Sequence, residues 1–165
     1  MSDQDPTGLW DHLDEMSDTD LAILVEVTGT VLANHAGNVD VGELRVTPLG
    51  PLAGQLATLA TEEGFDLPSD KARMIGQDQD IGRQAAIAVL KSIDPSSELA
   101  TEIADAYKIR HGMMIIPDPL TLSVLALFVL AIKLKRVKAS KAGVDVQFNQ
   151  VSSGALGFLR RLISI

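Results

Sequence analysis

The chain contains no cysteine, which excludes disulfide bonds, thiolate metal sites and cysteine nucleophiles. Aromatic side chains are few, with four Phe, one Trp and one Tyr among 165 residues. The hydrophobic 46 % of the chain must therefore come mainly from Leu, Ile, Val and Ala, which suits a core of packed helices. The length is sufficient for one domain with a sizeable core.

Positive charge is missing from the start of the chain. The first 20 residues hold seven acidic side chains and neither Lys nor Arg, whereas a secretory signal peptide opens with positive charge. We therefore expect a cytoplasmic protein. Residues 1–107 carry 20 acidic and 5 basic side chains, and residues 108–165 carry 2 acidic and 9 basic ones. The net charge of −8 disfavours a nucleic-acid partner, because phosphates would be repelled.

Motifs that carry known chemistry are also absent. The glycines form neither of the phosphate-binding patterns GxGxxG and GxxxxGK[ST], and no GxSxG nucleophile elbow occurs. The three histidines, His12, His35 and His111, are widely separated. His35 and His111 each stand at a predicted helix end, where the helix dipole favours a cation. The sequence thus predicts no catalytic residue, no metal ligand and no cofactor.

The longest apolar run, Leu120–Ile132, is followed at once by a basic flank, Lys133–Lys141. Its length as a helix is roughly 20 Å, whereas a bilayer core is about 30 Å thick. Extending the run back to Met113 brings in Pro117, Asp118 and Pro119, and an acidic residue is costly at membrane depth. We therefore predict a buried core helix, with a membrane element as the alternative.

Apolar residues at helical spacing predict further amphipathic helices, to give about six in all. Their ranges are about 18–34, 51–63 (ended by Gly64), 80–93, 94–108 and 152–165. Shorter signals predict a first helix near residues 9–16 and another after Ser69. Residues 1–8 are expected to be a disordered tail that precedes a single domain, 9–165, with a sub-boundary near 37–50.

Two segments carry strand signals. Glu43–Thr47 alternates in part, which suggests a short strand or an extended loop. Apolar residues also alternate with polar ones on either side of Lys141–Gly143, which predicts a β-hairpin over about 134–148. The predicted fold is therefore α+β and mostly helical, with a central apolar helix (about 119–133), a C-terminal β-hairpin and a terminal helix.

Three functional hypotheses follow. The first is a non-catalytic protein-protein interaction or regulatory module that uses the apolar helices of residues 113–165 to bind a protein partner or a second copy. The second is a membrane-associated protein that inserts Met113–Ile132 and places Lys133–Lys141 against anionic lipid. The third, which we place last, is a small enzyme whose site is assembled from distant residues.

The first two hypotheses share a set of contact residues. These are Leu122, Leu125, Phe128, Val129, Lys133, Lys135, Arg136, Lys138, Phe158, Leu159, Arg160 and Arg161.

Overall fold

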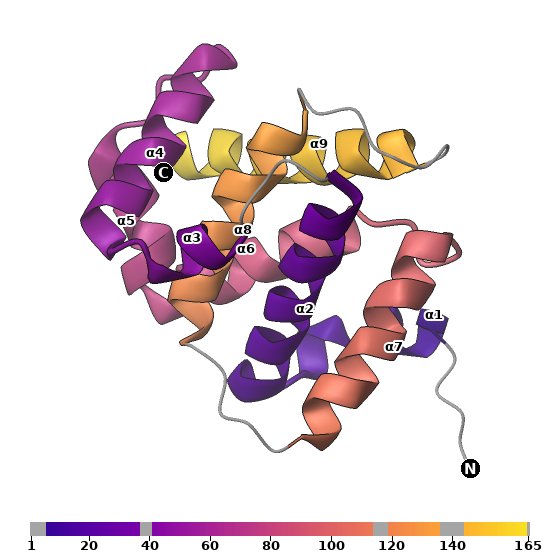
Figure 1. Ribbon diagram of the computed structural model, residues 1–165. Coiled ribbons are helices and arrows are strands. Elements are labelled where there is room, and N and C mark those ends of the chain that lie inside the picture. Colours follow the sequence, from indigo (N-terminus) through magenta and orange to yellow (C-terminus); the bar gives the residue numbers. More distant parts are fainter. Residues whose placement is uncertain (1–5, 37–40, 114–118, 136–143, 165) are drawn as a thin grey trace.

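The computed structural model describes residues 6–36, 41–113, 119–135 and 144–164, and these residues form helices joined by turns (Figure 1). Within those ranges no residue belongs to a β-strand. The predicted α+β class is therefore wrong, and the described part of the chain is all-helical.

The helices follow one another with short connections. They are α1 (Pro6–Asp11), the 3₁₀ turn η1 (Leu13–Glu15), α2 (Asp18–Ala36), α3 (Val41–Val46), α4 (Leu49–Glu62), α5 (Ser69–Gln77), α6 (Gln79–Lys91), α7 (Glu98–Gly112), α8 (Leu120–Leu134) and α9 (Val144–Ile163). Helix α1 begins inside the segment that was expected to be a tail, since residues 6–8 are helical.

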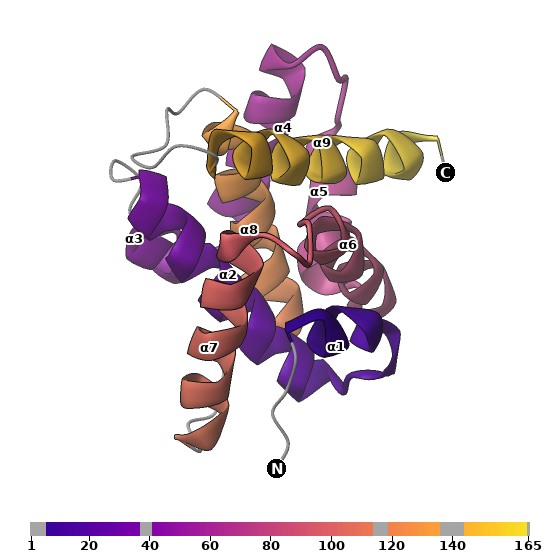
Figure 2. The same ribbon diagram turned by 90° about the vertical axis from the view of Figure 1, so that its right-hand side faces the viewer.

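Helix α8 is the centre of the molecule, as the apolar run predicted. It packs against α2, α3, α4, α5, α6 and α9 (Figures 1 and 2). Twelve of its fifteen residues are buried, and Phe128 is fully enclosed. A helix that is apolar on all sides is stable in water only when other elements cover all of its faces. None of the helices in the described ranges has both the length and the hydropathy that a bilayer crossing requires.

The predicted β-hairpin over about 134–148 does not form. Leu134 closes α8 and Val144–Ile163 is helical, while the expected bend at Lys141–Gly143 lies outside the described residues. Alternate residues of a strand share one face, yet Val146 is 56 % exposed and Phe148 only 1 %. Phe148 belongs instead to a helical stripe with Val151, Ala155 and Leu159, which packs on α6 and α8.

The extended segment expected at Glu43–Thr47 is also helical. Helix α3 covers most of it, and Leu44 is 4 % exposed because α3 packs against α8. The Thr47 hydroxyl donates to the carbonyl of Glu43 at 2.8 Å, a bond from residue i to residue i−4 that is typical of a helix. Five residues of partial alternation are too few to outweigh this packing.

Helix α9 crosses the C-terminal end of α8 and leaves one of its sides facing the turn between α4 and α5 (Figures 1 and 2). This turn begins at Gly64, whose φ of 89° is open to glycine but strained for other residues. The N–H of Phe65 donates to the Ala60 carbonyl at 2.9 Å, and that of Gly64 to Thr61 at 3.0 Å. These two bonds form a Schellman motif, which ends α4 and turns the chain towards α9.

Candidate functional site

Most of the apolar residues expected to contact a partner lie in the core of this chain. Leu125, Phe128, Val129 and Leu159 are fully buried, and Phe158 is 7 % exposed. Phe128 and Phe158 pack edge to face, with ring centroids 5.7 Å apart. In this conformation their surfaces are occupied by the other helices, so a partner would have to use neighbouring side chains.

The remaining predicted contact residues are dispersed. Leu122 is 37 % exposed and lies at a small apolar notch of about 80 Å³ between α3 and α8. Lys133 is half-buried at the end of α8. Arg161 is exposed on α9, while Arg136 and Lys138 lie outside the described residues.

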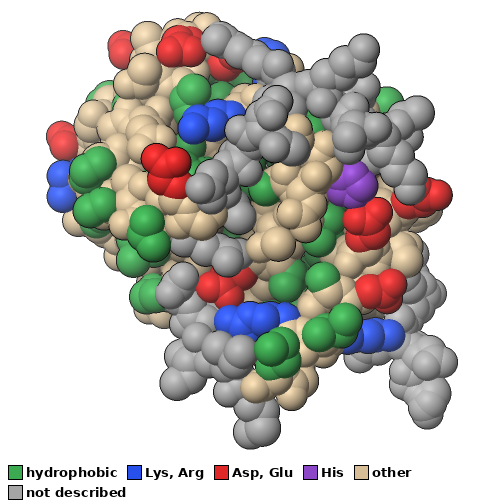
Figure 3. All heavy atoms as spheres, viewed as in Figure 1, with side chains coloured by type: hydrophobic (Ala, Val, Ile, Leu, Met, Phe, Trp, Pro, Cys, Tyr) green, Lys and Arg blue, Asp and Glu red, His purple; other side chains and the backbone are tan. Residues whose placement is uncertain are grey.

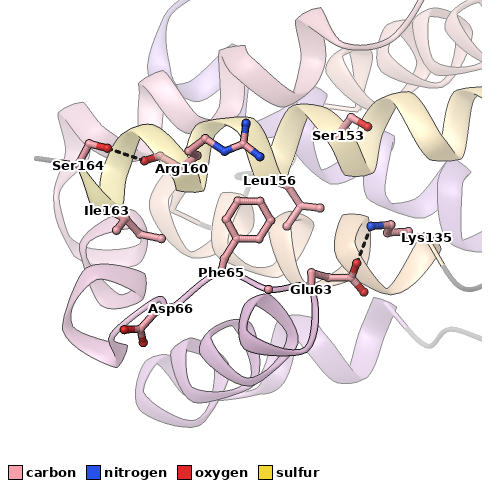
Figure 4. Close-up of a pocket in the computed structure, with 11 residues that line it drawn as sticks. Glu63, Phe65, Asp66, Lys135, Ser153, Leu156, Arg160, Ile163 and Ser164 are labelled. Atoms are coloured by element: carbon pink, nitrogen blue, oxygen red, sulfur yellow. Dashed lines mark hydrogen bonds and ion pairs between the residues drawn. The ribbon is translucent and has the colours of Figure 1, made fainter.

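Two of the predicted residues, Lys135 and Arg160, meet at one open groove. It has a volume of about 790 Å³ and runs between α9 and the α4–α5 turn (Figure 4). We call it the α9 groove. Its lining residues are Glu63, Gly64, Phe65, Asp66, Lys135, Ser153, Leu156, Gly157, Arg160, Ile163 and Ser164.

The floor of the α9 groove is apolar. Phe65 is partly buried and projects from the α4–α5 turn towards α9, where Leu156 and Ile163 lie on the facing side (Figure 4). Leu156 and Ile163 are seven residues apart, which places them two helical turns apart on one face of α9. Leu156, Ile163 and Phe65 thus form an apolar strip, and Arg160 lies between the first two along α9.

Charged side chains border this strip. The Lys135 ammonium lies 2.5 Å from a carboxylate oxygen of Glu63, whose side chain is only 8 % exposed. The Arg160 guanidinium lies over the Phe65 ring, with its carbon 5.2 Å from the ring centroid. Arg161 makes the equivalent contact with Phe158 at 5.4 Å, but outside the groove. Each guanidinium is thus held by an aromatic face.

Two glycines in α9 have different surroundings. A Cβ atom on Gly154 would lie 2.6 Å from the Cβ of Ser92, so this glycine allows α9 to approach α6 closely. A Cβ atom on Gly157 would meet no atom within 4 Å, and Gly157 lines the α9 groove. Packing within the described part of the chain therefore explains why position 154 is a glycine. It does not explain why position 157 is one.

The histidines lie away from the groove, where two of them help to join α2 to α7. His35 pairs with Glu102 at 2.8 Å and His111 pairs with Asp20 at 3.1 Å. Figure 3 shows a histidine among acidic side chains over these two helices. Neither histidine lines the hollows at α9, at α3–α8 or beside Ser92. Both histidines stand in the last turn of a helix, as expected, and each also makes a contact across to the neighbouring helix.

Tyr107 belongs to the same junction. Its ring centroid lies 5.3 Å from that of His111. Burial, with a smaller contribution from the nearby Asp20 charge, raises the pKa of the Tyr107 hydroxyl above its usual 10.0. A search of the described residues finds no group of three or more His, Asp and Glu side chains that could hold a metal ion.

Comparison of the chain with protein-family models, with curated proteins and with solved structures finds no match in any of the three. A function can therefore be inferred only from the geometry of this chain.

Sequence reasoning did not find most of the α9 groove. It selected Lys135 and Arg160 for their charge but did not identify Phe65, Leu156 or Gly157 as part of a site. A usable signal was present in the last helix, where Ser153, Gly157, Arg160 and Ser164 recur at helical spacing on a side that is not fully apolar. The contribution of the α4–α5 turn has no comparable signal, because it depends on how α4 and α9 meet.

Proposed function

We propose that this protein is a non-catalytic protein-protein interaction module and that the α9 groove docks a segment of another protein. The observation that carries this proposal is the groove itself, which combines an apolar floor with charged borders. Binding surfaces for partner helices have this composition, with apolar anchors at the centre and polar groups at the edge.

The dimensions of the groove suit a short helix. The lining residues of α9 extend from Ser153 to Ser164. The eleven helical steps between these two residues rise by roughly 16 Å, which is about three turns. A partner helix of similar length could place two or three apolar side chains on Phe65, Leu156 and Ile163. Anchors at this spacing are the usual pattern of recognition of a helix in a groove.

Gly157 supports the same assignment. A glycine inside a helix costs about 1 kcal/mol relative to alanine, because its backbone loses more conformational freedom on folding. Gly154 repays this cost by allowing α9 to lie close to α6. Close approach of a partner to the backbone at Gly157 would explain this second glycine in the same way, because a side chain at position 157 would project into the groove.

The membrane hypothesis requires a larger rearrangement. Insertion of Met113–Ile132 would remove α8 from the six helices that pack on it. Side chains such as Phe128 and Val129 hold the core together, and burial of each large aliphatic or aromatic side chain stabilises the fold by roughly 1.5–3 kcal/mol. A partner in the α9 groove leaves this core intact.

A steric block in the groove tests the proposal. Peptides of 16 residues would be selected from a random display library for binding to the full chain. Their affinities for the parent chain would then be compared with their affinities for two leucine variants. Gly157→Leu fills the groove. Gly54→Leu is the matched control, because Gly54 is also helical, has open space at its Cβ position and lies outside the groove.

We expect the selected peptides to bind the parent chain and Gly54→Leu equally and to lose at least tenfold in affinity with Gly157→Leu, which would show that the groove was blocked. Circular dichroism would check that both variants keep their helix content. A library that yields no binder, or binders that Gly157→Leu leaves unaffected, would contradict the proposal.

A further inference from the structure

The charges of the α9 groove are not equally neutralised. Lys135 is paired with Glu63, so this cation already has a carboxylate. Arg160 contacts the ring of Phe65, and no carboxylate of the described residues lies within ion-pair distance of its guanidinium. Arg160 is therefore the cation that the groove can offer to an occupant.

The contact with Phe65 prepares Arg160 for this role. The contact with the ring uses none of the guanidinium N–H donors in a hydrogen bond to a described residue, so these donors stay available to other groups. Those donors match the two oxygens of a carboxylate, which they can bind in parallel. Because the ring already restricts the long side chain, less conformational entropy is lost when an anion binds.

The surroundings reinforce the preference for negative charge. The last 14 residues, 152–165, contain two arginines and no acidic side chain. Asp66 is the acidic residue of the groove that points away from Arg160 (Figure 4). The positive potential is therefore strongest along the Arg160 side, and Asp66 weakens it from the opposite side of the groove.

We propose that the occupant of the α9 groove is an acidic amphipathic segment of a partner protein. This inference depends on the proposed function and specifies the partner's chemistry. The segment places apolar side chains on Phe65, Leu156 and Ile163, and a glutamate or aspartate accepts hydrogen bonds from Arg160. Recognition is thus specified by one guanidinium, held over the Phe65 ring, beside the apolar side chains of the groove.

The test separates recognition by Arg160 from general attraction to positive charge. Arg160 and Arg161 are adjacent, both lie on aromatic rings and both belong to the last turn of α9, where either one complements the helix dipole. Only Arg160 lines the groove. Arg161→Gln is therefore the matched control for Arg160→Gln, since each removes one positive charge at the same helix end.

The probes are a peptide from the display selection and its analogue with every Glu and Asp replaced by Gln and Asn. We expect the selected peptides to be acidic and the neutral analogue to bind more weakly. Arg160→Gln should lower the affinity for the acidic peptide about tenfold, while Arg161→Gln should change it by less than about twofold. Asp66→Asn should raise it by about two- to threefold, because a repulsive charge is removed.

Two results would overturn this inference. One is a selected pool that is neutral or basic, and the other is an equal loss of affinity in Arg160→Gln and Arg161→Gln. If such peptides are still blocked by Gly157→Leu, only the acidic-partner inference fails and the docking groove stands. Light scattering tests one more alternative. If the chain forms a dimer and Gly157→Leu abolishes it, the occupant of the groove is a second copy, and the acidic-partner inference fails.

Discussion

At the scale of single residues, the two glycines of α9 predict opposite effects of one substitution. Gly157→Ala should raise the free energy of unfolding by up to about 1 kcal/mol, because alanine is the better helix former and its Cβ meets no atom. Gly154→Ala should lower it by roughly 1–3 kcal/mol, since the new Cβ would lie 2.6 Å from that of Ser92. Urea unfolding of both variants measures the difference, and equal shifts would show that α9 does not pack on α6 as described.

Asp94 gives the molecule one identifiable pH dependence. The backbone N–H and the hydroxyl of Ser96 donate to its carboxylate at 3.0 and 2.8 Å and hold the pKa of Asp94 below the usual 3.8. A carboxyl group with a lowered pKa stabilises the fold above its unfolded-state pKa, and this contribution is lost as the pH falls through the folded-state value.

We therefore expect an NMR titration to place the Asp94 pKa below that of an unstructured aspartate. Asp94→Asn should remove the part of the acid destabilisation that arises below about pH 4. An Asp94 pKa at or above the value in an unfolded peptide would contradict the turn that starts α7.

At the scale of elements, α7 is an outer helix that contacts α2 and α1. Its central pair, Arg110 with Glu26 at 3.2 Å, is the best shielded, because the two side chains are 22 % and 8 % exposed. Arg110→Met should lower the free energy of unfolding by about 1–3 kcal/mol, since a largely buried carboxylate loses a charged donor.

The double variant Glu26→Gln with Arg110→Met should recover part of that loss, because the largely buried carboxylate that lost its charged donor is removed as well. Chemical denaturation of the single and double variants tests this coupling. Additive effects would mean that the two side chains do not act as a pair.

The helices could largely be predicted from the sequence, and the reason lies in strong local signals. Prolines before Leu120 mark the start of α8, and Gly64 ends α4 as expected. The start of α9 was mispredicted because Val146 and Phe148 alternate over a segment too short to distinguish a period of 2 from a helical stripe. The segment is helical because it packs on α6 and α8, and these contacts cannot be seen in the sequence.

At the scale of the whole molecule, the fold depends on a single helix that the others surround. Phe128→Ala should lower the free energy of unfolding by about 3–5 kcal/mol, because the ring is fully buried and the cavity cannot close completely. Leu122→Ala on the same helix should cost less than about 1 kcal/mol, since Leu122 is 37 % exposed. Similar losses in both variants, measured by urea unfolding, would contradict the placement of α8 at the centre.

The α9 groove exists only at this scale, which explains why sequence reasoning found so little of it. Glu63 and Lys135 are 72 residues apart in the chain, and their ion pair forms only because the C-terminal ends of α4 and α8 meet where the two helices pack together. The floor residue Phe65 stands in a short turn with no periodic pattern. Of the lining residues, only Lys135 and Arg160 were selected from the sequence, because their positive charge can be recognised without knowledge of the fold.

An NMR titration of the isotope-labelled chain with a selected peptide would show whether a partner segment docks in the α9 groove. We predict that the largest changes in backbone amide shifts fall in residues 63–66 and 153–164, with little change in α7. Shifts concentrated on another surface, or a titration that leaves the groove residues unmoved, would contradict the account.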